Sequence, residues 1–310
     1  MQCDRTTVTG GTGFLGSHLF EHLRYYSCTG TSGNLEYLAE RAVPAGPRRR
    51  HRLHPPARYG PRRVNFASRA APMDYLRLPI ETPKVGSHRT AARPRAGQGE
   101  RRSIPARLHQ LDVRRPRVRP HSKSHLGVRQ PGGTRGVYDE AKRFAEALTM
   151  AYRRSHGVDT AIVRILNTFG PRMRPDDGRA IPTFISQALR GEPLTIAGDG
   201  SQTRSICYVD DLVEGIVRVM RSHQRGPVDI GNPHELSVLA LAETLRDPIG
   251  TSSPITFIDR PVDDPTVRQP DIALARTALG WEPRMPIEDG LKQTIAWFRE
   301  HSGMFVHTDG

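Results

Sequence analysis

The sequence predicts an α/β fold with a doubly wound parallel sheet and a smaller mixed lobe toward the carboxyl end. Three observations support this class. A glycine-rich turn lies near the N-terminus, a tyrosine and a lysine lie one helical turn apart in the middle, and short apolar runs alternate with amphipathic segments from residue 160 onward. The 310 residues suffice for one two-lobed domain with a sizeable core.

The glycine-rich turn covers residues 9–16 and runs into an apolar helix start. Gly10, Gly13 and Gly16 are three residues apart. In a dinucleotide-binding turn the first glycine allows the tight bend, the second lets backbone N–H groups approach a pyrophosphate, and the third lets helix and strand pack closely. A flexible glycine-rich loop has similar composition, and residues 1–7 are less apolar than the strand expected before the turn, so the turn needs a second supporting motif.

That second motif is the pair Tyr138 and Lys142, at positions i and i+4 of a predicted helix. An ammonium group beside a phenol favours the phenolate, which lowers the tyrosine pKa and suits it to proton transfer. The apolar face of this helix is predicted to comprise Ala141, Phe144, Ala145, Leu148 and Tyr152.

The carboxyl half alternates strands and helices. A buried strand is predicted over residues 160–165, with Asn167 and Thr168 at its carboxyl end, where doubly wound folds bind ligands. Further elements are a helix over 181–189 ended by Gly191, a helix capped by Asp210 and Asp211 and running through Met220, a strand over 228–230, and helices over 237–245, 271–279 and 287–300.

The charge is divided unevenly. Residues 41–135 hold 22 Arg and 2 Lys against 4 acidic residues, a net charge of +20. Because the whole chain has a net charge of +14, the remaining residues have a net charge of −6. The same block holds 13 of the 26 prolines, and its composition is typical of a disordered basic linker. A nucleic-acid-binding insert is a second interpretation, although few aromatic residues are interleaved. A third hypothesis is a frameshift in a GC-rich gene, which resequencing the locus tests.

The motifs of residues 137–146, 164–173, 176–179, 198–204 and 208–211, together with the glycine turn, resemble a known family. It comprises the NAD-dependent nucleotide-sugar epimerases and dehydratases, which are extended short-chain dehydrogenase/reductases, and the similarity points in particular to the UDP-glucuronic acid decarboxylases (UDP-xylose synthases). The resemblance covers residues 137–299, 9–23 and 65–82, whereas residues 28–64 and 88–135 depart from it.

The resemblance implies a Rossmann-like NAD-binding domain over residues 1–170 and a nucleotide-sugar-binding lobe over 171–303 that is interleaved with it, followed by a tail over 304–310. In the family the tyrosine takes the proton of the sugar C4 hydroxyl, and the lysine holds the nicotinamide ribose. The implied catalytic residues are Tyr138, Lys142 and Arg268, and the implied substrate-binding residues are Tyr152, Asn167 and Arg204. The implied NAD-binding residues are Gly10, Gly13, Phe14, Leu15, Gly16, Tyr138, Lys142, Thr168, Arg174 and Arg179.

Two family features are missing from their expected places. A Thr-Ser-Glu segment that supplies a hydroxyl and a carboxylate to the sugar is replaced by residues 108–112, which read LHQLD. No ribose-binding acid is assigned, because no apolar strand precedes Glu36 or Glu40. An inactive family remnant and a basic nucleic-acid-binding derivative therefore stay open as alternatives to an enzyme.

As an enzyme, the chain is expected to use NAD to oxidise C4 of UDP-glucuronate, lose carbon dioxide and regain the hydride, giving UDP-xylose. A 4,6-dehydratase or a 4-epimerase acting on a UDP- or dTDP-hexose would share most of the motifs. We further expect a cytoplasmic homodimer without a structural metal or disulfides, because the three cysteines are scattered and no apolar run is long enough for a membrane span.

Overall fold

The computed structural model describes residues 6–9, 13–25, 62–66, 71–84, 136–157, 159–260 and 269–301. Gly10, Arg268, the tail and most of the basic block lie outside these ranges. The described elements, in chain order, are β1 (Thr6–Thr9), α1 (Phe14–Tyr25), β2 (Arg62–Asn65), α3 (Pro72–Arg77), α5 (Gly136–His156), β3 (Ile162–Ile165), β4 (Thr168–Phe169), α6 (Ala180–Leu189), β5 (Leu194–Ala197), β6 (Thr203–Ser205), β7 (Cys207–Tyr208), α7 (Val209–Arg221), β8 (Pro227–Ile230), β9 (Glu235–Ser237), α8 (Val238–Ile249), β10 (Ile255–Ile258), α9 (Ala273–Leu279) and α10 (Ile287–Glu300).

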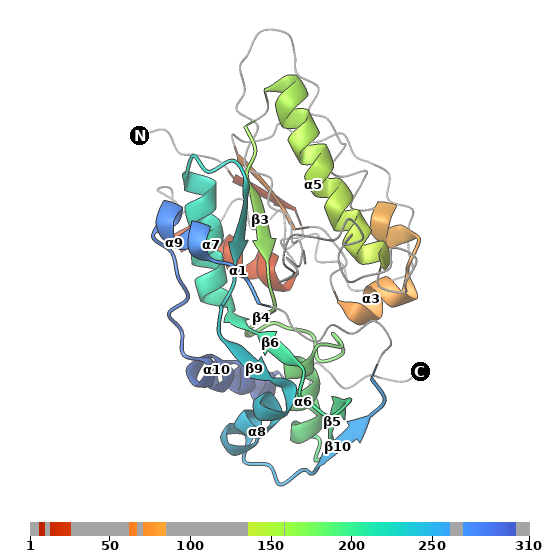
Figure 1. Ribbon diagram of the computed structural model, residues 1–310. Coiled ribbons are helices and arrows are strands. Elements are labelled where there is room, and N and C mark those ends of the chain that lie inside the picture. Colours follow the sequence, from red (N-terminus) through yellow and green to blue (C-terminus); the bar gives the residue numbers. More distant parts are fainter. Residues whose placement is uncertain are drawn as a thin grey trace, which may run out of the picture.

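The upper part of the molecule in Figure 1 has a strand layer between helices. Strand β1 pairs in parallel with β2, and β3 pairs in parallel with β8. Helices α7 and α9 pack on one side of the β3–β8 pair, and α5 lies on the other. Parallel strands with helices on both faces are the arrangement of a doubly wound fold.

Burial on both faces explains the composition of the central strands. Three of the four residues of β3 are buried, and Ile162, Ile165, Val228 and Ile230 are each at most 1 % exposed. Such strands consist of β-branched apolar residues because neither face contacts water. The predicted strands over 160–165 and 228–230 thus lie where the sequence places them.

The lower lobe consists of helices α6, α8 and α10, which pack against one another. Beside them β5 pairs in parallel with β10, and β6 pairs in antiparallel fashion with β9. The lobe is not a separate carboxyl tail, because α7, β8 and α9 return from it to the upper layer. Strands far apart in the sequence are therefore paired, as β3 is with β8 and β5 with β10.

Helix ends follow local chemistry. The Ser237 hydroxyl accepts a hydrogen bond from the backbone N of Ala240, which caps α8. Gly250 ends α8 with φ of 68°, and Gly280 ends α9 with φ of 59°. Both conformations are left-handed, which a residue without a Cβ adopts without strain.

The predicted capping of α7 by Asp210 and Asp211 is wrong. The helix begins at Val209, so both carboxylates belong to its first turn, and Tyr208 is the N-cap residue without a side-chain cap. The carboxylate of Asp211 instead accepts hydrogen bonds from the backbone N atoms of Arg284 and Met285 at 2.9 and 2.8 Å. Backbone N–H groups from a distant segment thus bind the carboxylate that the local sequence pattern assigns to a helix cap.

The predicted apolar face of α5 is correct only in part. Ala141 and Ala145 are buried, but Phe144 is 50 % exposed and Thr149 is fully buried, with its hydroxyl donating to Ala145 O. The buried stripe is therefore rotated away from Phe144, and it includes Tyr138, Lys142 and Thr149.

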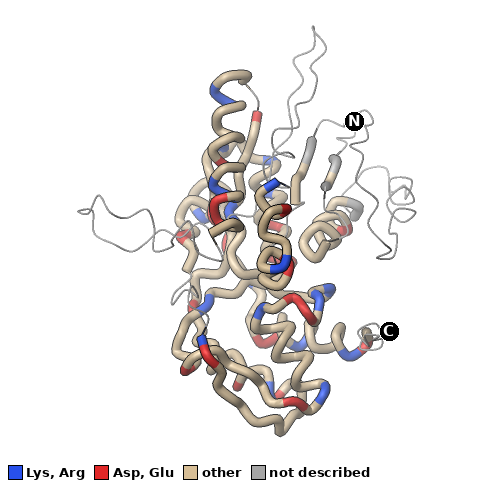
Figure 2. Tube along the Cα trace, turned by 90° about the vertical axis from the view of Figure 1, so that its right-hand side faces the viewer, with Lys and Arg blue, Asp and Glu red and all other residues tan. Residues whose placement is uncertain are grey.

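Charged residues of both signs are interspersed over the described elements, as Figure 2 shows. Several of them form pairs along one helix, such as Arg218 with Glu214 and Lys292 with Asp289. Within the described ranges no helix combines the length and apolar character that a bilayer crossing requires.

Candidate active site

Tyr138 and Lys142 lie together in the interior near the start of α5. Tyr138 is 6 % exposed and Lys142 is 5 % exposed. The Lys142 Nζ lies 5.2 Å from the centroid of the Tyr138 ring. Burial disfavours the charged ammonium and lowers the Lys142 pKa to about 7. The i and i+4 spacing therefore places a phenol beside an amine that titrates near neutrality.

A second aromatic ring, on helix α3, packs against Tyr138. Tyr75, on α3, is 3 % exposed and stacks on Tyr138 with ring centroids 5.2 Å apart and an interplanar angle of 27°. An offset stack of this kind restricts the orientation of both rings. Sequence reasoning did not single out Tyr75, although it lies within the family-like stretch over residues 65–82.

The end of the glycine turn is placed at the start of α1. Gly13 precedes the helix, Phe14 and Leu15 are half-buried in its first turn, and Gly16 is buried. The first four N–H groups of a helix have no acceptor within it, so this end of α1 presents donors and positive dipole charge to an anion. The geometry suits a phosphate-binding turn.

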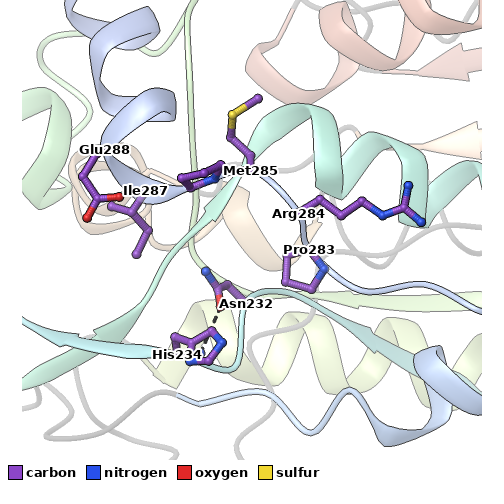
Figure 3. Close-up of a pocket in the computed structure, with 8 residues that line it drawn as sticks. Asn232, His234, Pro283, Arg284, Met285, Ile287 and Glu288 are labelled. Atoms are coloured by element: carbon purple, nitrogen blue, oxygen red, sulfur yellow. Dashed lines mark hydrogen bonds between the residues drawn. The ribbon is translucent and has the colours of Figure 1, made fainter.

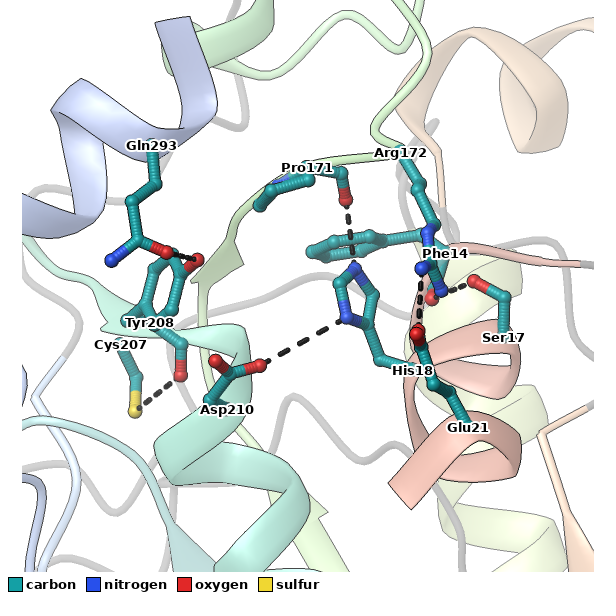
Figure 4. A network of polar contacts seen from close by, with 10 residues as sticks. All are labelled: Phe14, Ser17, His18, Glu21, Pro171, Arg172, Cys207, Tyr208, Asp210 and Gln293. Atoms are coloured by element: carbon teal, nitrogen blue, oxygen red, sulfur yellow. Dashed lines mark hydrogen bonds and ion pairs between the residues drawn. The ribbon is translucent and has the colours of Figure 1, made fainter. Parts of the chain in front are cut away.

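A polar network joins α1 to the rest of the molecule, as drawn in Figure 4. The His18 Nε2 lies 3.0 Å from Pro171 O, so this nitrogen carries the donated proton, and Nδ1 lies 4.0 Å from the carboxylate of Asp210. Glu21 pairs with Arg172, whose φ of 68° is left-handed. The network fixes α1 against the loop after β4 and against α7.

Asn167 and Thr168 follow β3, as predicted, but both already have protein partners. The Asn167 Nδ2 donates to Ser205 O at 3.3 Å, and the Thr168 hydroxyl donates to Leu166 O at 2.8 Å. Two residues later, a Cβ on Gly170 would lie 3.6 Å from the Phe14 ring. The structure therefore brings the loop after Thr168 against the start of α1.

The predicted arginines differ in what they contact. Arg174 pairs with Asp74 of α3 at 3.2 Å, which places it next to the segment that stacks on Tyr138. Arg179 forms a paired contact with Asp177. Arg204, on β6, donates to Thr203 O at 2.8 Å. Among these contacts between described residues, those of Arg174 thus join it to the Tyr138 region.

Tyr152 lies well away from the tyrosine–lysine pair. It is half-buried on α5, with its ring 5.5 Å from that of His156. Fourteen residues of helix separate it from Tyr138, which corresponds to roughly 21 Å along the axis. The structure does not bring these two side chains together within one chain.

A pocket of about 290 Å³ lies between the turn after β8 and the start of α10, as Figure 3 shows. None of the predicted site residues within the described ranges lines it. Its walls comprise Asn232, His234, Pro283, Arg284, Met285, Pro286, Ile287 and Glu288.

Comparison with known proteins places this site in a family. The sequence model of the NAD dependent epimerase/dehydratase family matches residues 116–231. UDP-glucuronic acid decarboxylase 6 of Arabidopsis thaliana is 38 % identical over 97 % of this chain and 90 % of its own length. The chain belongs to the NAD-dependent epimerase/dehydratase family. UDP-glucuronic acid decarboxylase 1 of Xenopus tropicalis is also 38 % identical, over 96 % of this chain and 72 % of its own length.

Solved structures of similar proteins confirm the predicted fold class. UDP-glucose 4-epimerase of Thermotoga maritima has a TM-score of 0.73 at 21 % identity and covers 96 % of this chain and 99 % of its own. A dTDP-glucose 4,6-dehydratase of Streptomyces venezuelae, solved with NAD, has a TM-score of 0.73 at 22 % identity, over 97 % of this chain and 99 % of its own. These structures confirm the doubly wound α/β fold class, and the 38 % identical decarboxylase confirms the family resemblance drawn from the sequence motifs.

The residues present fit a dinucleotide in this family. The start of α1 offers backbone donors for a pyrophosphate, and Gly16 is buried where helix and strand meet. Lys142 is a buried amine on α5, and its protonated form would be stabilised by ribose hydroxyl oxygens. One glycine of the turn, Gly10, lies outside the described residues.

Proposed function

We propose that this chain catalyses the NAD-dependent decarboxylation of UDP-glucuronate to UDP-xylose through a C4-keto sugar. The buried pair of Tyr138 and Lys142 carries the proposal, in a chain that matches named UDP-glucuronic acid decarboxylases over most of their length. Bound NAD would supply the acceptor for the hydride from C4 and would return it after decarboxylation.

In this proposal Tyr138 holds and moves the proton of the C4 hydroxyl. Its phenolic oxygen accepts that proton as C4 is oxidised and donates it back when C4 is reduced. The ring stacked on Tyr75 restricts the direction in which the oxygen points. Protonated Lys142 stabilises the phenolate, and its effect is strong because a buried charge is poorly screened.

The ketone at C4 is β to the carboxylate, so the C5–C6 bond breaks, carbon dioxide leaves, and the electron pair of that bond stays on the sugar as an enolate. A proton then adds to C5, and the returned hydride restores the C4 alcohol. We assign Arg268 to the substrate carboxylate, and Asn167, Arg204 and Tyr152 to the nucleotide sugar. Thr168, Arg174 and Arg179 are assigned to the surroundings of the cofactor. These assignments are extensions of the family resemblance.

The test begins with cofactor retention. The purified chain is denatured and the released dinucleotide is quantified, with about one equivalent per chain expected because the reaction regenerates NAD and favours tight retention. Turnover is then measured with UDP-glucuronate, UDP-glucose and dTDP-glucose by product mass and release of carbon dioxide. Release of carbon dioxide and formation of UDP-xylose support the proposal, whereas epimerisation or dehydration of a hexose contradicts it.

The assembly and location complete the proposal. We propose a homodimer in the cytoplasm, with a nucleotide sugar as the small-molecule partner. A monomer mass at micromolar concentration in solution would contradict the dimer.

A further inference from the structure

Helix α5 is tied to strand β3 by a paired ionic contact beyond Tyr138. The Arg164 Nε lies 3.1 Å from Glu146 Oε2, and its Nη2 lies 2.7 Å from Glu146 Oε1. The remaining nitrogen, Nη1, lies 3.8 Å from Asp229 Oδ1 on β8. The three side chains are 15 to 19 % exposed. A planar guanidinium that meets a carboxylate with two nitrogens fixes distance and orientation together.

The contact lies on the same stripe of α5 as the tyrosine–lysine pair. Glu146 is four residues after Lys142 and eight after Tyr138, which corresponds to about 6 and 12 Å along the helix axis. Residues at this spacing share one face of a helix. A shift or rotation of α5 at Glu146 would therefore be transmitted to Tyr138.

The other partner of the contact, Arg164, lies on the strand that runs to Asn167, which is assigned to the substrate. Arg164 precedes Asn167 by three residues, about 10 Å of extended chain. Both β3 and β8 are buried and paired in parallel, so Arg164 is attached to a rigid layer. The contact thus fixes a helix that carries one part of the site to a strand that leads to another.

We propose that Arg164 is a positioning residue for the reaction. Its paired contact with Glu146 sets the place of α5 on the sheet, and so sets the geometry between Tyr138 and a sugar held near Asn167. Asp229 holds the guanidinium from the other side. This inference rests on the proposed function, because it concerns the transfer of proton and hydride at the sugar.

Arg164→Lys tests the inference, because lysine retains the charge and loses the two-nitrogen contact. The chain offers a matched control in Arg190, which makes the same contact to Glu192 with both nitrogens at 2.8 Å. That pair is exposed on the lower lobe. Both variants are compared by turnover of UDP-glucuronate per bound NAD, by the deuterium isotope effect at C4 and by thermal unfolding.

The expected result for Arg164→Lys is a fall in kcat of roughly tenfold to hundredfold with little change in KM, because small misplacement of reacting groups is costly. The isotope effect should rise, since hydride transfer becomes slower relative to the other steps. Arg190→Lys should leave both kcat and the isotope effect unchanged. A kcat per bound NAD that matches the control would overturn the inference, even if Arg164→Lys unfolds at a lower temperature.

Amide hydrogen exchange over residues 136–145 separates this inference from the proposed function, because it needs no substrate. Faster exchange there in Arg164→Lys, and not in Arg190→Lys, supports the positioning of α5 even if the unaltered chain does not decarboxylate UDP-glucuronate. Unchanged exchange overturns it. Should Arg164→Lys fail to fold, Glu146→Gln removes the carboxylate charge and one of the two acceptor oxygens from the helix side, and it is judged by the same measurements.

Discussion

The Nζ of Lys142 lies 5.2 Å from the centre of the Tyr138 ring, and both side chains are almost completely buried. Burial has two opposed consequences for this pair. It strengthens the influence of the ammonium charge on the phenol, and it lowers the pKa of the lysine that carries the charge to about 7. The site is thus arranged so that a small change in its surroundings decides the protonation of the lysine.

Tyr138→Phe should abolish most turnover while leaving the fold intact. Phenylalanine keeps the ring that stacks on Tyr75 and removes only the hydroxyl, so thermal unfolding and NAD retention should change little. We expect kcat for UDP-glucuronate to fall by at least about 10²- to 10⁴-fold, the usual contribution of a general acid–base group. Tyr208→Phe is the control, because it removes a hydroxyl bound to Gln293, and its turnover should persist.

Lys142→Met should change how stability depends on pH. The folded-state pKa of about 7 lies below the ordinary lysine value, so between pH 7 and 10 the unfolded chain binds more protons than the folded one. The free energy of unfolding of the unaltered chain should therefore rise with pH across this window.

In Lys142→Met that rise should be absent, because methionine does not titrate. Denaturant unfolding at several pH values between 7 and 10 measures the difference, with Lys292→Met, at an exposed position, as the control. Parallel pH curves for the unaltered chain and Lys142→Met would contradict the buried environment of the lysine.

His18→Gln should reduce the loss of stability in mild acid. Burial lowers the His18 pKa, with the positive charge of Arg172 adding to that effect, while the hydrogen bond to Pro171 O and the charges of Asp210 and Glu21 oppose it. Below the unfolded-state pKa near 6.5 the unfolded chain therefore binds more protons, and stability falls as pH decreases.

Glutamine can still donate to Pro171 O but cannot take up a proton. The free energy of unfolding of His18→Gln should therefore decline less between pH 7 and 5 than that of the unaltered chain. The comparison is made by denaturant unfolding, with His156→Gln, an exposed position, alongside. A decline as steep as that of the unaltered chain would show that His18 does not titrate as the structure predicts.

Gly215→Ala should destabilise the packing of α7. A Cβ at this position would lie 2.7 Å from Ile230 Cγ2 and 2.9 Å from Trp281 Cε2. The indole has little freedom to move, because its Nε1 donates to Asp211 O at 3.0 Å. Alanine gains about 1 kcal/mol of helix propensity, but overpacking costs about 1–3 kcal/mol, so we expect a net loss.

Thermal or denaturant unfolding measures this loss, and Gly226→Ala is the matched control, since nothing lies within 4 Å of its added Cβ. Equal stability of the two variants would mean that α7 and the indole can move apart at little cost.

Sequence alone determined the features that depend on neighbouring residues. Tyr138 and Lys142 share a face because helical spacing requires it, and the strands over 160–165 and 228–230 follow from short runs rich in Ile and Val. The glycine spacing and the motifs after Val163 determined the family, which comparison confirmed.

Tertiary structure decided which polar groups meet. Asp211 follows the local pattern of a helix cap, yet it binds backbone N–H groups more than seventy residues away. Arg164 and Glu146 are separated by a loop, and neither residue by itself indicates a partner. Hydrogen bonds and ion pairs form wherever the chain brings donors and acceptors within reach, and that proximity is set by the packing of α5, β3 and β8 rather than by any short stretch of sequence.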